Sequence, residues 1–221
     1  DKSEAYTIRA EASKKTFEYI SNNYKEIAVK KGEDHIMKRF SGSLGNEDTG
    51  SSAIAHRNKK LITKEEICKS LGWDVRKEIV CIFGHALIDG NFLNGWRIFR
   101  DNLTWLRETL YFILNINKYN WFIKPHPMEI EYPQSKTNTL KEFNTIIAKA
   151  NHIKILPNNI SHMSLINIVD YAVTNNGSVP LEFASLGKKS LMAGRSDFSE
   201  IVFKDQLPKN KKEYFEKLEN F

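Results

Sequence analysis

Short apolar runs recur along the second two thirds of the chain, and they predict strands separated by helices. A continuous apolar run such as Ile79-Val80-Cys81-Ile82-Phe83 is expected for a strand that is buried on both faces of a parallel sheet. Runs of this kind predict five strands, at 79–83, 121–125, 153–156, 171–174 and 190–193. Helices are predicted between them, near 95–118, 138–150 and 179–186, with a short helix from Ser161.

This alternation of strand and helix is typical of an α/β protein with a doubly wound, Rossmann-like parallel sheet. We therefore predict a Rossmann-like domain over residues 73–203. The lysine-rich tail, 204–221, carries Tyr214, Phe215 and Leu218 at helical spacing. The tail is predicted to pack as a closing helix.

Residues 1–72 are predicted to form a helical and loop extension in front of that domain. Apolar residues at 3-4 spacing predict an amphipathic helix over about 10–31, and we expect another part of the protein to cover its apolar face. These apolar residues are Phe17, Ile20, Tyr24, Ile27 and Ala28. A loop rich in glycine and serine follows over 41–58, and loops of this length are often functional. The basic residues that flank it are interpreted as surface charge; they are Arg39, His56 and Arg57.

A second helix of the extension is predicted from its capping residues. Thr63 is the predicted N-cap, and Glu66 stands three residues later, which is the spacing of a capping box. Gly72 is the predicted end of this helix, because glycine adopts the left-handed conformation of a helix C-terminus without steric cost.

Composition adds limits on the kind of protein. The chain is 41% hydrophobic and 27% charged, which is ordinary for a soluble globular protein, and no apolar run approaches the ~20 residues that span a bilayer. With neither a span nor a signal peptide visible, we expect a cytoplasmic protein, or one held peripherally at the inner face of the cytoplasmic membrane. Cys68 and Cys81 lack metal-ligand spacing and are predicted to be reduced thiols.

The net charge of +6 suits an acidic partner such as a sugar nucleotide, an anionic lipid surface or a nucleic acid. The basic residues are spread along the chain, however, and no nucleic-acid-binding motif is present. A solvated basic surface is therefore the favoured interpretation, and we expect no nucleic-acid partner.

The strand at 121–125 ends in the most informative polar residues of the chain, Lys124 and His126, each followed by a proline. Ligands of open α/β sheets bind outside the carboxyl ends of the strands, so this stretch predicts an anion site. The alternative is an edge strand that ends at a proline turn with two solvated polar groups.

A second candidate site follows the strand at 171–174. Asn176 and Gly177 suit the positive φ angles of a tight turn, and Pro180 is preset for the first turn of a helix. This is the pattern of a phosphate-binding turn whose free N–H groups face an anion. Glu182, one turn into the helix, is placed to accept hydrogen bonds from ribose hydroxyls, although strand-turn-helix segments without ligands are also common.

The first strand exits toward His85 and Asp89, which we expect at the same rim of the sheet. A histidine can protonate or hydrogen-bond a phosphate near neutral pH, and a carboxylate can accept a proton from a hydroxyl nucleophile. Either residue could instead stabilise a turn. His152 and His162 are assigned structural roles, and no metal-ligand cluster is expected because the histidines and cysteines are scattered.

With these elements placed, the sequence resembles the capsular polysaccharide biosynthesis glycosyltransferases, the group that contains the Kdo transferases of capsule assembly. The resemblance spans roughly residues 36–195. Its matching segments are Arg39-Phe40-Ser41-Gly42, Gly84-His85 with Asp89, Trp105-Leu106, Lys124-Pro125-His126-Pro127, Ile155-Leu156-Pro157 with Ser161, and Asp170 through Asn176-Gly177-Ser178 and Glu182 to Gly187-Lys188.

The resemblance implies a GT-B architecture of two Rossmann-like domains, of which the C-terminal one holds the nucleotide-sugar. It implies that Lys124 and His126 bind the donor phosphate together with Ser178 and the backbone at Gly177, beside Asn176. Catalysis would need no metal or other cofactor. A complete GT-B enzyme is around twice this length, so the acceptor-binding half is missing, minimal or encoded elsewhere.

The function expected from this resemblance is transfer of a sugar from a CMP- or UDP-sugar to a bacterial capsular or other surface polysaccharide. His85, Asp89 and His126 are the candidate catalytic residues, and Glu182 would hold the ribose or the sugar. The expected partners are the donor, a glycan or lipid-linked glycan acceptor, and the inner membrane or other capsule-assembly proteins. The alternatives are a CDP-polyol phosphotransferase of the teichoic-acid type and a non-catalytic nucleotide- or glycan-binding subunit.

Overall fold

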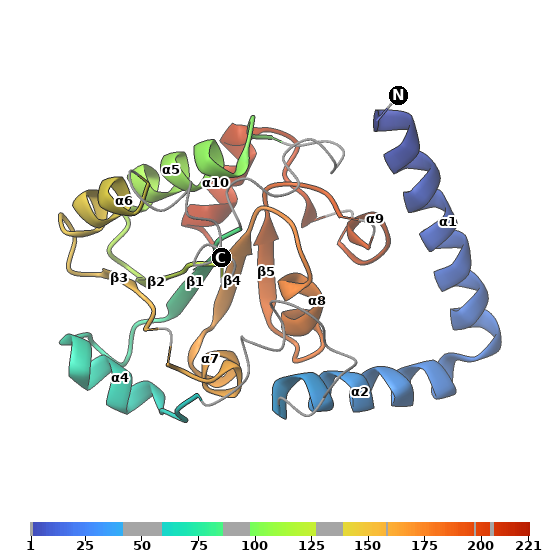
Figure 1. Ribbon diagram of the computed structural model, residues 1–221, viewed down its shortest axis with the longest axis horizontal. Coiled ribbons are helices and arrows are strands. Elements are labelled where there is room, and N and C mark those ends of the chain that lie inside the picture. The colour runs from blue at the N-terminus through green and yellow to red at the C-terminus, as the bar shows by residue number, and fades with distance from the viewer. Residues whose placement is uncertain are drawn as a thin grey trace.

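The structure is a computed structural model that describes residues 2–41, 59–85, 98–126, 139–157, 159–196, 198–203 and 206–221 (Figure 1). At its centre lies a five-stranded, fully parallel sheet with the strand order β3-β2-β1-β4-β5. The strands are β1 Ile79–Phe83, β2 Asn120–Lys124, β3 Ile153–Ile155, β4 Tyr171–Thr174 and β5 Lys189–Met192. The predicted α/β class is confirmed, and the parallel sheet is consistent with a Rossmann-like arrangement. Each strand falls within about one residue of its predicted range.

Helices lie on both faces of this sheet and beside it (Figure 1). They are α1 Lys2–Asn23, α2 Lys25–Ser41, α4 Lys64–Leu71, α5 Asn102–Ile113, α6 Thr139–Ile147, α7 His162–Ile168, α8 Val179–Ala184, α9 Ser199–Val202 and α10 Lys211–Glu219. The capping box at Thr63 is confirmed, since its hydroxyl accepts from the Glu66 N–H while the Glu66 carboxylate accepts from the Thr63 N–H. Gly72 ends α4 at a φ of 66°, as predicted.

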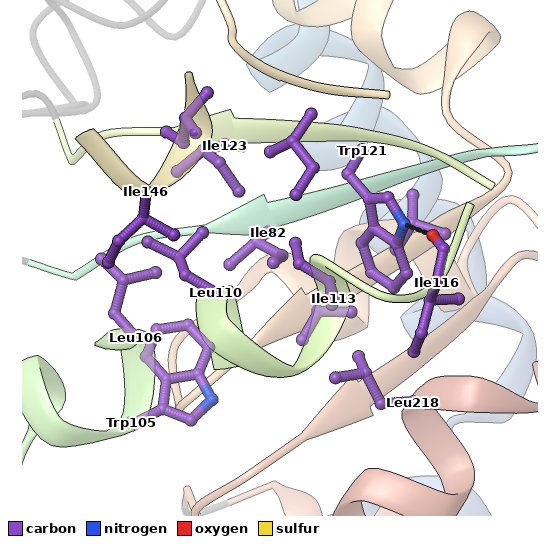
Figure 2. Packing of buried hydrophobic residues seen from close by; sticks show 14 of the residues in the cluster. Ile82, Trp105, Leu106, Leu110, Ile113, Ile116, Trp121, Ile123, Ile146 and Leu218 are labelled. Carbon is purple, nitrogen blue, oxygen red and sulfur yellow. Dashed lines mark hydrogen bonds between the residues drawn. The ribbon is translucent and has the colours of Figure 1, made fainter. Parts of the chain in front are cut away.

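The two faces of β1 belong to two separate hydrophobic clusters, because successive side chains of a strand point in opposite directions. Val80 and Ile82 pack with α5, α6 and α10, whereas Ile79, Cys81 and Phe83 pack with α4, α7 and α8. Figure 2 shows the first cluster, in which side chains of α5 point at the sheet. Every residue of β1 is therefore buried, as its continuous apolar run predicted.

α4, which the sequence analysis placed in the N-terminal extension, packs into the second cluster. Its residues Ile67 and Cys68 are almost completely buried beside β1. Both cysteines of the chain are free thiols in this apolar layer. Burial raises the pKa of Cys68, and it raises the pKa of Cys81 to about 12, so neither thiol is activated as a nucleophile.

α5 is shorter than the predicted helix over 95–118. Asp101 is its N-cap, and the Asp101 carboxylate accepts a hydrogen bond of 2.6 Å from the Thr104 N–H. The other end of α5 gives way to turns at Asn115 and Ile116. Apolar periodicity continues past both points, which is why the pattern overestimated the helix.

The N-terminal extension differs most from its prediction. It forms two helices, α1 and α2, which meet near Tyr24 and run as a bent arm along the side of the domain that carries α8 and α9 (Figure 1). The expected cover over the apolar residues of 10–31 is not present in the part of the chain that the structure describes. Phe17 remains 49% exposed and Ile27 59% exposed. The arm contacts the domain through α9 and α7, and its buried apolar residues are Ala10 in the first half of α1 and Phe40 at the end of α2.

The closing helix was predicted correctly. α10 buries Tyr214 and Leu218 completely against α5 and β5. The Tyr214 hydroxyl accepts a hydrogen bond of 2.9 Å from Trp105 Nε1 and lies 3.0 Å from Thr109 Oγ1. Burial raises the pKa of Tyr214 above its usual range, so the phenol stays protonated as the tail closes the core.

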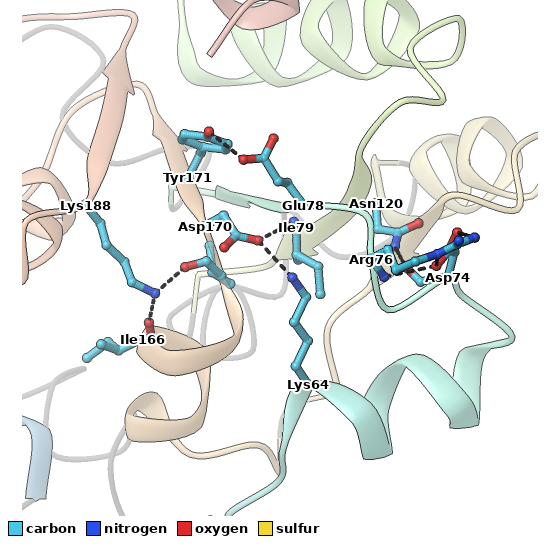
Figure 3. Close-up of polar contacts among 11 residues, drawn as sticks. Lys64, Asp74, Arg76, Glu78, Ile79, Asn120, Ile166, Asp170, Tyr171 and Lys188 are labelled. Atoms are coloured by element: carbon cyan, nitrogen blue, oxygen red, sulfur yellow. Dashed lines mark hydrogen bonds and ion pairs between the residues drawn. The ribbon is translucent and has the colours of Figure 1, made fainter.

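Polar contacts tie the helices to the amino ends of the strands (Figure 3). The Asp170 carboxylate accepts from Lys64 Nζ at 3.2 Å and from the Ile79 N–H at 2.8 Å, which joins α4 and β1 to the residue that precedes β4. The Lys188 ammonium donates to the Val169 and Ile166 carbonyl oxygens at the end of α7. These side chains are bound to one another or to the backbone, so their contacts hold the amino ends of the strands to α4 and α7.

No described helix has both the length and the apolar character needed to cross a bilayer.

Candidate functional site

The register of the sheet places three predicted site residues at one rim. Phe83 of β1 pairs with Lys124 of β2 on one side and with Thr174 of β4 on the other. His85, His126 and Asn176 each stand two positions beyond one of these aligned residues. The predicted meeting of three polar strand ends at one edge of the sheet is therefore observed.

This rim lies at the point where the direction of strand addition reverses. From β1 the chain adds β2 and β3 on one side, and it then returns to add β4 and β5 on the other. In open α/β sheets the loops that leave two such neighbouring strands diverge and open a crevice for ligands. His85 follows β1 and Asn176 follows β4, so both belong to the loops at this reversal.

His85 connects these two loops directly. Its Nε2 accepts a hydrogen bond of 3.1 Å from the Asn176 N–H, contacts the Asn176 carbonyl oxygen and lies 3.2 Å from Thr174 Oγ1. The His126 ring lies parallel to the His85 ring, with 6.4 Å between ring centres and 9° between planes. The two histidines thus lie near one another where β1, β2 and β4 end, and His85 binds the turn that follows β4.

The turn after β4 has the conformation that its sequence predicted at Gly177, where φ is +113°. A Cβ atom at this position would lie 3.4 Å from His85 Cε1, so glycine also provides space for the histidine ring. Within the described part of the chain, the N–H groups of Gly177 and Ser178 have no hydrogen-bond partner. Such unpaired donors in a glycine turn are suited to an anion.

Lys124 supplies a partly buried cation at the same rim. Its Nζ lies 5.5 Å from the centre of the Phe83 ring. Burial lowers the pKa of Lys124, the negative charge of Glu182 opposes this shift, and the cations Lys59 and Arg39 add to it. A desolvated ammonium interacts more strongly with an incoming anion than a surface lysine does, because less water screens it.

Glu182 is buried, with 4% of its side chain exposed, and already holds two donors on one oxygen. Its Oε1 accepts from Arg39 Nε at 3.0 Å and from Ser178 Oγ at 2.9 Å. The interpretation of Arg39 as plain surface charge was therefore wrong. The sequence did not reveal this pair, because no local pattern relates α2 to a carboxylate 143 residues away. The roles predicted for Ser178 toward phosphate and for Glu182 toward ribose stay predictions.

Several charges act on the ammonium of Lys124. Burial removes water that would otherwise screen it, and Glu182, Lys59 and Arg39 all shift its pKa electrostatically. A desolvated cation on the same rim as N–H donors that have no partner among the described residues favours a ligand that carries negative charge.

Two buried asparagines, which were not among the predicted site residues, hold the residue that precedes the glycine turn. Asn175 and Asn102 are both buried, and Asn175 Nδ2 donates to Asn102 Oδ1 at 2.6 Å. The Asn175 carbonyl oxygen also accepts from the Gly194 N–H at 2.6 Å. These contacts fix the residue after β4 to the start of α5 and to the second residue after β5. A polar residue at the end of an apolar strand was the available signal, but it did not reveal the partner.

The remaining candidates divide into described and undescribed residues. Asp89 lies outside the described residues, as do Pro127 and the loop region with His56 and Arg57. His152 has the structural role expected of it, since its Nε2 lies 3.0 Å from the Ile113 carbonyl oxygen. The ranges that the structure describes hold no group of three or more histidine, cysteine, aspartate or glutamate side chains arranged to bind a metal ion.

No protein-family model matches the sequence, and no curated protein matches it. The features that bear on function are therefore those of the rim formed by β1, β2 and β4.

Proposed function

We propose that this chain is the donor-binding part of a glycosyltransferase that moves a sugar from a CMP- or UDP-sugar to a bacterial surface or capsular polysaccharide. The observation that carries the proposal is the partly buried ammonium of Lys124 at the strand ends, on the rim that also carries the N–H groups of Gly177 and Ser178, which have no partner among the described residues. The position of this cluster at the reversal of strand order supports it, because nucleotides bind there in other parallel α/β sheets.

The proposed reaction needs the features that this rim offers. The acceptor hydroxyl oxygen attacks the anomeric carbon, the bond from that carbon to the donor phosphate oxygen breaks, and the hydroxyl proton passes to a base. Negative charge grows on the departing phosphate, and cations with fixed N–H donors stabilise that charge most in the transition state. We assign this task to Lys124, His126 and the turn at Gly177. His85 or Asp89 is the proposed base or leaving-group acid.

The first test is binding of nucleotides. We expect calorimetry to detect binding of at least one of CMP, UDP, CDP and GDP, and we expect Lys124→Met to weaken that binding. Lys189→Met is the matched control, because it removes one exposed lysine at the amino end of β5, on the opposite side of the sheet. Absence of binding to all four nucleotides, or equal loss in both variants, contradicts the proposal.

The second test separates the reaction classes. A glycosyltransferase is expected to bind the CMP- or UDP-sugar in preference to CDP-glycerol in a competition assay. Preference for CDP-glycerol assigns the chain to polyol phosphate transfer instead. If the chain binds a nucleotide but shows no turnover, and turnover appears when a second protein chain is added, the chain is a binding subunit.

A further inference from the structure

Arg39 belongs to the N-terminal arm, α1 and α2, and forms an ion pair with Glu182 at the rim of the sheet. It lies in the last turn of α2, and 22% of its side chain is exposed. Its partner Glu182 lies in α8, directly after the glycine turn. The pair therefore joins the arm to the helix that directly follows the glycine turn, whose N–H groups have no partner among the described residues.

The charge of Glu182 would otherwise act against the proposed ligand. A buried carboxylate repels a phosphate, and it attracts the nearby ammonium of Lys124. Arg39 cancels that negative charge through a contact of 3.0 Å. With Glu182 paired, the positive charge of Lys124 remains available to an anion.

Glu182 also competes with the proposed ligand for the hydroxyl of Ser178. Ser178 Oγ donates its only proton to Glu182 Oε1 at 2.9 Å. To donate to a phosphate, this hydroxyl must rotate away from Glu182, and a buried carboxylate that loses its donors is costly. Arg39 donates to the same oxygen, so Glu182 keeps one charged partner when Ser178 turns to the ligand.

We propose that Arg39 is a positioning residue of the anion site: by holding Glu182 Oε1, it leaves Lys124 and the Ser178 hydroxyl to bind the phosphate of the ligand. This inference rests on the proposed function, because it takes the rim to be a phosphate site. It assigns to the arm a role in ligand binding that does not require the arm to touch the ligand.

The test uses inorganic pyrophosphate as the probe, because it has no ribose and so leaves out the role predicted for Glu182 toward that sugar. Arg39→Gln is expected to weaken pyrophosphate binding about tenfold, which is the effect of one charged hydrogen bond. Glu182→Gln should bind at least as well as the wild type. The double variant Arg39→Gln/Glu182→Gln should recover most of the affinity, because it removes the carboxylate together with its partner.

The double variant distinguishes positioning from direct contact. If Arg39 itself binds the anion, the double variant stays as weak as Arg39→Gln, and the inference is overturned. Arg39→Lys keeps the positive charge and is expected to retain most of the affinity. Arg76→Gln is the matched control, since it removes an arginine from an exposed ion pair with Asp74 that precedes the amino end of β1, opposite the rim. It should leave binding unchanged.

A second readout works without any ligand. Lysine side-chain NMR, assigned with a Lys124→Met variant, reports the pKa of Lys124. Arg39→Gln should raise this pKa, because a cation is removed and Glu182 is left to stabilise the ammonium, and the double variant should bring it back toward the wild-type value. An unchanged pKa in Arg39→Gln overturns the inference. Failure of the wild type to bind pyrophosphate contradicts the proposed function, and the NMR result still decides whether Arg39 controls the charge at Lys124.

Discussion

The imidazole rings of His85 and His126 lie parallel at the ends of two neighbouring strands, with their centres 6.4 Å apart. His85 also binds the backbone of Asn176 on the other side, whereas His126 reaches the same place from β2. His85 therefore has a structural role in holding the turn, and we propose that both imidazole rings face the ligand.

This difference predicts distinct effects of removing each ring. His85→Ala should lower nucleotide affinity and also loosen the turn at 175–178, because a hydrogen bond to the Asn176 N–H is lost. His126→Ala should lower affinity by a similar factor, about tenfold, without loosening the turn. Hydrogen exchange and calorimetry measure the two effects. His152→Ala is the control and should change neither; wild-type affinity in both site variants contradicts the assignment.

Gly177 is expected to tolerate no side chain. Gly177→Ala forces an L-residue to a φ of +113° and places its Cβ 3.4 Å from His85 Cε1, so we expect a loss of about 1–3 kcal/mol of unfolding free energy together with weaker ligand binding. Gly187→Ala is the matched control, because φ is +70° there and the site for a Cβ is open. It should reduce stability, as measured by urea denaturation, but leave binding intact. Equal binding by the two variants contradicts the role given to this turn.

Lys124 should lower the free energy of unfolding of the protein, although it contributes to binding of the proposed anionic ligand. Burial lowers its pKa in the folded protein, so protonated Lys124 disfavours folding, and Lys124→Met should be more stable than the wild type near neutral pH. Between the lowered folded pKa and the ordinary unfolded value of about 10.4, the unfolded state binds more protons, so the stability of the wild type rises with pH. The advantage of the variant should therefore shrink as pH rises through this window. Urea titrations at several pH values measure it, and an advantage that stays constant contradicts the account.

Tyr214 tests the closing helix independently of the site. Tyr214→Phe removes the acceptor of Trp105 Nε1 and a partner of Thr109 in a fully buried position, so we expect a loss of about 1–3 kcal/mol. Thermal denaturation should show a melting temperature lower by a few degrees, with unchanged nucleotide affinity. A variant as stable as the wild type shows that the tail does not close the core through this contact.

The sequence predicted the parts of this structure that depend on short stretches of chain. Buried strands need apolar runs, and the carboxyl ends of parallel strands share one edge, so the meeting of His85, His126 and Gly177 followed from the order of the elements. The capping box at Thr63 and the left-handed Gly72 were predictable for the same reason, because their hydrogen bonds are local.

The contacts that sequence reasoning missed join distant segments. Nothing near Arg39 indicates a partner in α8, and nothing near Asn175 indicates Asn102. The apolar spacing at Phe17 and Ile27 correctly indicated helix, but helical spacing does not say what covers a face, and the described residues leave both side chains about half exposed. Tertiary pairing of this kind requires the structure.

The most direct test of the central claim is a crystal structure of the protein with the nucleotide that calorimetry selects. We predict that its phosphate lies at the carboxyl ends of β1, β2 and β4, within about 3 Å of Lys124 Nζ and of the Gly177 or Ser178 N–H. A nucleotide bound at any other place on the protein, with this rim unchanged, would contradict the account.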